Sequence, residues 1–268
     1  MFFQPFGLIA ARGGFLLLLH SSDLVSRILS RMVTLRKSSK KSRRVNSAVS
    51  IKVARGPKRK FQNRLLKWYS EFGRDLPWRR TSDPYKILVS EVMLQQTQVD
   101  RVIPKYHEFL EKYPTLKDLA AAEPDDVRQT WYPLGYNIRP YRLHSIACEA
   151  VERYGGTIPN DSEELQSMKG IGRYTAGAVR SFAFNEDAPI LDTNVMRVLH
   201  RVFIGNGDPR TKKSRLWVMS EELIPKGKGY DFNQALMDFG AMVCTARNPY
   251  CTYCPMQGFC QAYPAEKK

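Results

Sequence analysis

The chain has 268 residues, of which 43% are hydrophobic and 25% charged, and its formal net charge is +16. This length and composition are those of a globular protein with one large or two modest domains. No apolar run reaches the roughly 18 residues needed to cross a bilayer, which excludes an integral membrane protein with spanning helices. An excess of positive charge favours polyanionic partners, of which nucleic acid is the commonest.

The positive charge is concentrated at the N-terminus. Residues 1–60 hold 14 of the 42 lysines and arginines with Asp23 as their only acid, and residues 61–268 hold 28 basic and 25 acidic residues. We predict that residues 1–60 form a disordered basic arm, with a dense charge cluster at Lys37–Arg44. The arm is a poor secretory signal, and two interpretations stay open: an organellar transit peptide, or a true start at Met32.

From Phe61 onward, apolar residues recur at helical spacing almost everywhere, and no alternating run has the length of a strand. Prolines and glycines separate the segments. The sequence therefore predicts an all-α fold. The predicted helices span 61–73, 84–94, 99–113, 118–122, 125–134, 139–154, 162–168, 174–184, 195–203, 213–223 and 231–243.

Four of the five cysteines lie close together near the C-terminus. Cys244, Cys251, Cys254 and Cys260 have the spacing C-x6-C-x2-C-x5-C. Soft thiolates gathered in so short a segment predict a metal or cluster site, because the sulfurs can converge without long loops. A chain with one other cysteine, Cys148, does not resemble a disulfide scaffold. The spacing alone leaves structural zinc and an iron–sulfur cluster open.

A second motif is the run from Leu165 to Ala176, in which a helix enters Met-Lys-Gly-Ile-Gly-Arg-Tyr and a second helix follows. Glycines at 170 and 172 permit a positive φ and a close backbone approach. The amide groups that open the next helix can then bind a phosphate. This pattern is typical of a helix-hairpin-helix, which contacts the DNA backbone without reading its sequence. The alternative is an ordinary tight turn.

Two carboxylates stand in segments of unusual composition. Glu91 lies in a mostly apolar helix, and from the residues alone we expect its side chain to be exposed, the alternative being a pocket that raises its pKa. The polar run that follows it is predicted to be a turn, with Thr97 capping the next helix. Asp192 follows an apolar run and precedes an amphipathic helix, so that it is predicted to be the N-cap, a role compatible with catalysis.

Taken together, these segments resemble the helix-hairpin-helix DNA glycosylase superfamily, and within it the MutY-type adenine DNA glycosylases. The resemblance covers Leu76–Cys260. It rests on motifs in the family's order and spacing: Leu76–Arg79, Ser90–Val99, Leu134–Tyr136, Gly170–Ala178, Leu191–Val195, Phe239–Cys244 and the four cysteines. It implies two helical domains and a [4Fe–4S] cluster on Cys244, Cys251, Cys254 and Cys260, which decides between the cluster and zinc.

The resemblance also implies roles for single residues. Glu91 matches the general acid that protonates the leaving adenine at N7, and Asp192 matches the carboxylate that stabilises the sugar cation. Asn194 and Tyr174 match residues that position this machinery. Tyr174 also stands where the endonuclease III branch has its Schiff-base lysine, which predicts a monofunctional glycosylase. The residues implied to contact DNA are Gln95, Gln96, Tyr136, Gly170, Gly172, Arg173 and Thr175.

Two departures from the family keep other functions open. The chain ends at Lys268, where MutY-type enzymes usually continue into a domain that reads 8-oxoguanine, and Asn137 replaces the second of the usual paired tyrosines. The main expectation is excision of adenine opposite 8-oxoguanine or guanine. The alternative is a mismatch thymine or uracil glycosylase of the same superfamily, and a more distant one is a non-catalytic protein that binds mismatches.

The expected architecture places Glu91 and the hairpin in a domain of residues 77–187. Residues 61–76 and 188–262 are expected to form the cluster domain, and 263–268 a tail. We expect a monomer that binds double-stranded DNA with a mismatched or oxidised pair and no membrane. The DNA substrate and the cluster imply an intracellular location with DNA, in the cytoplasm or nucleoid.

Overall fold

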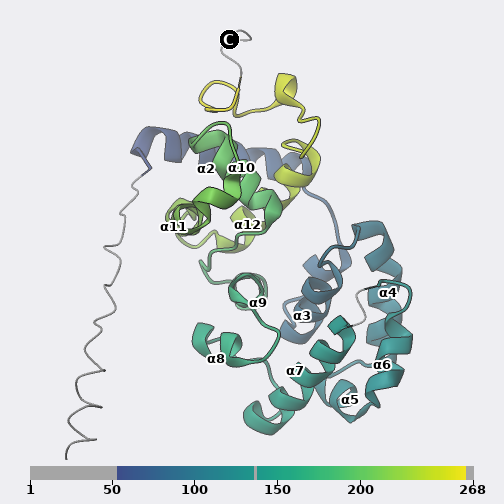
Figure 1. Ribbon diagram of the computed structural model, residues 1–268. Helices are drawn as coiled ribbons and strands as arrows, with labels where there is room; N and C mark the ends of the chain where they lie inside the picture. The colour runs from purple at the N-terminus through teal and green to yellow at the C-terminus, as the bar shows by residue number, and fades with distance from the viewer. Residues whose placement is uncertain (1–52, 136–137, 264–268) are drawn as a thin grey trace, which may run out of the picture. The chain divides into compact units, whose positions relative to one another are not determined.

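The computed structural model describes residues 53–135 and 138–263 (Figure 1). The predicted charge cluster, the transit segment and Tyr136 lie outside these residues. In the described part the regular structure is helical, without strands, as the spacing of apolar residues predicts. The α-helices are α2 (Arg55–Phe72), α3 (Pro84–Met93), α4 (Val99–Lys112), α5 (Leu116–Ala121), α6 (Pro124–Trp131), α7 (Ile138–Tyr154), α8 (Ser162–Ser167), α9 (Arg173–Ala183), α10 (Thr193–Phe203), α11 (Lys213–Leu223) and α12 (Gly229–Met242). Short 3₁₀ helices occupy η1 (Pro77–Arg79), η2 (Pro209–Lys212) and η3 (Cys251–Tyr253).

Several helices begin where a short polar side chain accepts a hydrogen bond from the first turn. Asp83 caps α3, Thr115 caps α5 in a capping box with Asp118, and Asp161 caps α8. Each cap satisfies backbone N–H groups that the helix itself cannot pair. These local contacts explain why the predicted boundaries agree with the observed ones to within about two residues for most helices.

The helices bury two clusters of hydrophobic side chains. One lies among α3 to α9 and includes Phe109, Trp131 and Leu143. The other lies among α2, α10, α11 and α12, where α12 packs against both α2 and α10. Helix α9 supplies residues to both clusters, with Val179 in the first and Phe182 in the second. Helix α9 therefore connects the two hydrophobic cores.

The start of α2 corrects the sequence-based expectation. Residues up to 60 were expected to be disordered, yet α2 begins at Arg55. Tertiary contacts hold this first turn: the Val53 N–H donates to Glu222 Oε1 at 3.0 Å, and the Lys58 ammonium donates to the Glu222 carbonyl oxygen. Charge density along the sequence gives no sign of these distant acceptors.

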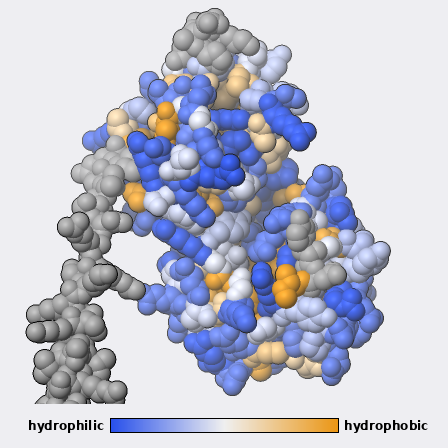
Figure 2. Space-filling model, viewed as in Figure 1, coloured by the Kyte–Doolittle hydropathy of each residue, from blue (hydrophilic) through white to orange (hydrophobic). Residues whose placement is uncertain are grey.

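Hydrophilic residues predominate on the face shown in Figure 2, and hydrophobic residues gather there only in small areas. A membrane-spanning helix is not among the described helices, since none joins sufficient length to sufficient apolar character.

Candidate active site

Glu91 lies on α3, and only 4% of its surface is exposed. Helix α3 is buried on nearly every side, because it packs against α4, α7 and α9. The expectation of an exposed carboxylate, drawn from the residues alone, is therefore wrong. When three helices pack around a helix of ten residues, almost none of its surface is left to solvent. Its one acid is then buried together with its apolar residues.

Burial raises the pKa of Glu91 to about 7. The Tyr174 hydroxyl beside it lowers the pKa, the charge of Asp192 raises it, and the charge of Arg79 lowers it. Desolvation has the largest effect, because the loss of hydration destabilises the carboxylate more than the Tyr174 hydroxyl and the Arg79 charge together stabilise it. Glu91 therefore holds a proton over part of its population at neutral pH, as a general acid must.

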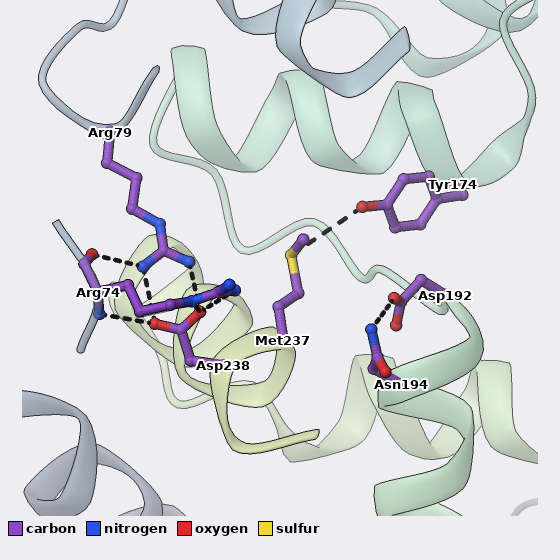
Figure 3. Close-up of polar contacts among 7 residues, drawn as sticks. All are labelled: Arg74, Arg79, Tyr174, Asp192, Asn194, Met237 and Asp238. Carbon is purple, nitrogen blue, oxygen red and sulfur yellow. Dashed lines mark hydrogen bonds and ion pairs between the residues drawn. The ribbon is translucent and has the colours of Figure 1, made fainter. Parts of the chain in front are cut away.

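Asp192 is the N-cap of α10, as its position in the sequence predicts. Its Oδ1 accepts from the Val195 N–H at 2.6 Å, and its Oδ2 accepts from Asn194 Nδ2 at 3.0 Å (Figure 3). Burial raises the pKa of Asp192 above its ordinary value, and these two hydrogen bonds and the charge of Arg197 reduce that rise without reversing it. Hydrogen bonds of this kind favour the ionised form.

Tyr174, on α9, lies close enough to both carboxylates to respond to their charges. Burial raises its pKa well above the ordinary value, and the charges of Glu91 and Asp192 add to the effect. The phenol thus keeps its proton, and its hydroxyl points toward Met237 Sδ at 4.0 Å (Figure 3). Three of the residues to which the sequence assigns catalytic roles are therefore brought together: the buried Glu91 and the half-buried Tyr174 and Asp192.

A hydrogen-bond relay links Asp192 to the cysteine region. Asn194, which holds Asp192, accepts from Arg197 Nη2 at 2.8 Å, and Arg197 Nε donates to the Cys244 carbonyl oxygen at 2.8 Å. Gly240 permits this contact between α10 and α12, because a Cβ there would lie 2.8 Å from the Cβ of Asn194. Sequence reasoning missed Arg197, although it lies on the same face of α10 as Asn194.

A buried ion-pair network lies on the other side of Met237. Asp238, on α12, is fully buried and accepts from Arg79 Nη1 and Nη2 at 2.8 and 2.9 Å and from the Arg74 N–H at 2.9 Å (Figure 3). Burial alone would raise the pKa of Asp238, but the two arginines hold it below its ordinary value. Asp238 thereby reduces the effect of the Arg79 charge on Glu91. The only signal in the sequence was an acid within the apolar helix α12.

The predicted hairpin lies between α8 and α9. Gly170 has a φ of +115°, which only glycine adopts without strain, and Gly172 is the N-cap of α9 with open space around its Cα. No side chain caps α9, so its first N–H groups are left for a ligand. Arg173 stacks over the Trp217 ring at 4.1 Å, and the Thr175 side chain is buried, so that Thr175 can offer only its backbone N–H.

The polar run after α3 is a turn, as predicted. Gln96 is exposed and has a φ of +56°, and Gln95 is half-buried. The expectation that Thr97 caps α4 is wrong: Gln98 is the N-cap residue, and Thr97 Oγ1 instead accepts from Arg139 Nη2 at 3.1 Å. The buried guanidinium of Arg139, on α7, thus takes the place of the expected hydrogen bond between Thr97 Oγ1 and the first turn of α4.

The four C-terminal cysteines are free thiols that line one cavity of about 330 Å³. The described residues contain no group of three or more histidines, cysteines or acids placed around a single metal ion. Zinc held by four thiolates at about 2.3 Å needs sulfurs about 3.8 Å apart, whereas an iron–sulfur cluster fills a larger space between them. The four thiols that line this cavity are soft ligands of the kind that a cluster or a zinc ion takes.

Hydrogen-bond donors already point at two of these sulfurs. Arg201 Nη1 lies 3.6 Å from Cys244 Sγ, and the Met256 N–H lies 3.4 Å from Cys254 Sγ. Burial raises the pKa of the Cys254 thiol to about 12, and that of Cys260 is also raised. A bound cationic centre would have the opposite effect on the pKa of these thiols, because thiols that coordinate a metal lose their protons outright. Donors to sulfur are a usual means of supporting a cluster.

The chain also matches known proteins. The model of the HhH-GPD superfamily base excision DNA repair protein matches residues 89–221. The chain is 44% identical to the adenine DNA glycosylase of Mus musculus over 214 residues, which cover 76% of this chain and 42% of that protein. It is 38% identical to the thymine/uracil-DNA glycosylase of Pyrobaculum aerophilum, with 74% of this chain and 88% of that protein covered.

Among solved structures, a thermostable thymine-DNA glycosylase superposes with a TM-score of 0.73 at 33% identity, covering 80% of this chain and 98% of that one. The chain belongs to the HhH-GPD superfamily of base excision DNA repair proteins. Its resemblance to the MutY-type members is supported by adenine DNA glycosylases that are 39 to 44% identical. It spans about two fifths of the length of the mammalian relatives it matches.

Proposed function

We propose that the protein is a monofunctional DNA glycosylase that hydrolyses the N-glycosidic bond of adenine mispaired with 8-oxoguanine or guanine. The observation that carries this proposal is a pair of carboxylates beside Tyr174. Burial makes Glu91 a proton donor at neutral pH, and two hydrogen bonds hold Asp192 and favour its ionised form, although burial raises its pKa. The leaving base needs a proton and the developing sugar cation needs a nearby negative charge. The reaction therefore requires one protonated carboxylic acid and one ionised carboxylate.

Glu91 acts as the general acid. Its raised pKa keeps a proton available at neutral pH, and that proton passes to the leaving adenine, at N7 by resemblance to the family. The N-glycosidic bond breaks as the base accepts the proton, so that adenine leaves neutral. Water then adds to the anomeric carbon, and its proton restores the carboxylic acid of Glu91.

Asp192 stabilises the positive charge that develops on the sugar. Its two hydrogen bonds, from the Val195 N–H and from Asn194, fix the carboxylate and favour its ionised form. Tyr174 keeps its proton and has no amine, so it cannot form a Schiff base with the sugar. We therefore expect base release without strand cleavage.

Binding to DNA is assigned to two surfaces of the chain. The uncapped N-terminus of α9, behind Gly170 and Gly172, suits a backbone phosphate. The exposed turn with Gln95 and Gln96 suits insertion into an opened duplex, which an enzyme acting on a base in DNA must produce. We propose that the substrate is duplex DNA with a mismatched or oxidised pair.

We further propose that Cys244, Cys251, Cys254 and Cys260 hold a [4Fe–4S] cluster. When bound, the cluster supplies a cationic centre that fixes the loop following α12. The Arg201 and Met256 donors that face two of the sulfurs support this assignment. Iron and inorganic sulfide should be present in equal amounts in the purified protein, and Cys254→Ser should lower both, whereas Cys148→Ser should change neither.

The function is tested by single-turnover base release on four duplexes, with A opposite 8-oxoguanine, A opposite G, T opposite G and U opposite G. We expect adenine to be released and the strand to stay intact until alkali is added. No release from any duplex, with binding retained, would contradict the proposal and favour a non-catalytic protein.

A second candidate is excision of mismatched thymine or uracil. The chain matches the Pyrobaculum aerophilum thymine/uracil-DNA glycosylase over 88% of that protein, a larger share than of the mammalian adenine enzymes. The identity is lower, at 38% against 44%. Release of thymine or uracil alone would select this candidate.

A further inference from the structure

Arg139, near the start of α7, makes an unusual number of contacts for one side chain. It is 3% exposed, and its guanidinium lies over the Trp131 ring at 5.4 Å. Six oxygen atoms accept hydrogen bonds from its two terminal nitrogens, at 2.6 to 3.2 Å: the carbonyl oxygens of Val92, Met93, Gln95, Leu134 and Gly135, and Thr97 Oγ1.

The six acceptors divide between two chain segments about 40 residues apart. Nη1 donates to the last turn of α3 and to the Gln95 carbonyl oxygen at 2.6 Å. Nη2 donates to Thr97 Oγ1 at 3.1 Å in the first segment and to the Leu134 carbonyl oxygen at 3.0 Å in the second. One rigid, planar group thus fixes the turn after α3 and the segment before α7 relative to each other.

The turn after α3 has a backbone conformation that needs such support. Gln96 has a positive φ, a strained conformation for a non-glycine residue that persists only where the surrounding structure holds it in place. Gly135, with a φ of +72°, directly follows Leu134. The last-turn carbonyl groups of α3 have no helical partner, and Arg139 satisfies two of them on the helix that carries Glu91.

We propose that Arg139 is a positioning residue for opening the duplex. It fixes the turn with Gln95 and Gln96 against the segment that ends at Gly135, so that the turn is held ready to enter the duplex when the target base leaves the stack. This inference rests on the proposed function, and it assigns to Arg139 no contact with the reacting base.

The test compares each variant with the wild type on two duplexes. The first carries A opposite 8-oxoguanine within paired sequence, and the second is the same duplex with both flanking pairs mismatched. Arg139→Lys keeps the charge but cannot supply two separated nitrogens. We expect its single-turnover base release to fall by up to about 100-fold on the paired duplex, because a small misplacement of the turn is enough to cause such a loss. On the mismatched duplex the loss should shrink by about tenfold, because opening costs less there.

The matched control is Arg153→Lys, at the other end of α7, where the arginine pairs with Glu149 on the surface. This variant should release base at the wild-type rate on both duplexes. Thr97→Val removes one acceptor without changing the shape of the side chain, and should show the same duplex dependence at smaller size. It keeps the proposal testable if Arg139→Lys folds poorly.

A second readout does not depend on base release. With 2-aminopurine beside the target adenine, wild-type protein should raise the fluorescence on binding, and Arg139→Lys should raise it less at equal occupancy. Equal loss on both duplexes, or an unchanged fluorescence rise, would overturn the proposal and leave Arg139 a purely structural residue. If the wild type releases no base, the proposed function fails, while the fluorescence still tests Arg139.

Discussion

The regions around Glu91 and Asp192 differ in how many polar groups face the carboxylate. Glu91 lies on a helix that is buried on nearly every side, and the Tyr174 hydroxyl is the hydrogen-bonding group beside it. Asp192 lies at a helix N-terminus, where a backbone N–H and the Asn194 amide both donate to it. Two acids beside the same phenol, one buried and one half-buried, thus have unlike surroundings.

This difference teaches how one fold divides acid and base roles at neutral pH. At Glu91 desolvation outweighs Tyr174 and Arg79 and raises the pKa to about 7, whereas at Asp192 the hydrogen bonds from the start of α10 reduce the rise in pKa that burial causes. The charge of Asp192 also raises the pKa of Glu91, so the two roles reinforce each other. The predictions below test whether the division is real.

The largest effect is expected from Glu91→Gln. Glutamine keeps the size of the side chain but has no acidic proton, so single-turnover base release should fall about 10²- to 10⁴-fold. Glu108→Gln, which removes an exposed acid paired with Lys105, is the matched control and should not change the rate. A rate within about threefold of the wild type would exclude Glu91 as the general acid.

A smaller loss is expected from Asp192→Asn. The substitution removes the negative charge near the sugar, and base release should fall about 10²- to 10³-fold. Thermal stability should change little, because asparagine is as good an N-cap as aspartate. Asp192→Ala, which also removes the cap, should lose about 1 kcal/mol of unfolding free energy in denaturant titrations. Equal stability of the two variants would contradict the capping role.

The pH dependence of base release should reveal the coupling between the two carboxylates. Glu91 must be protonated, and its pKa is about 7, so the rate should fall about tenfold per pH unit above pH 7. In Asp192→Asn the bend should move to lower pH, since the charge that raises the pKa is gone. A bend that stays in place would show that the two carboxylates act independently.

The smallest effect is on stability. Between pH 4.5 and 7, Glu91 binds more protons in the folded state than in the unfolded one, so stability falls as pH rises across this interval. Above pH 7 the full cost, about 3 kcal/mol, is present. Glu91→Gln should therefore raise the melting temperature by about 5–10 °C at pH 8, and by little at pH 4.5. Equal shifts at both pH values would contradict a buried, ionisable Glu91.

Much of the fold could be predicted from the sequence, because helix boundaries depend on local chemistry. The caps at Asp83, Asp161 and Asp192 are short polar residues placed just before apolar periodicity, and each begins a helix as such residues do. The turn at Gln95 and the glycine at 170 were recognisable for the same reason. The roles given to individual site residues stay predictions that the experiments above decide.

The sequence by itself determined the helical fold, the hairpin, the order of the motifs and which residue types are present for chemistry. Only the tertiary structure decided that Glu91 is buried, that Asp238 neutralises Arg79, that Arg197 links Asn194 to Cys244, and that Arg139 takes Thr97 away from its helix. The physical reason is distance along the chain. A cap or a turn is set by neighbours within four residues, whereas desolvation and buried arginine contacts depend on groups that folding brings together from far apart in the sequence.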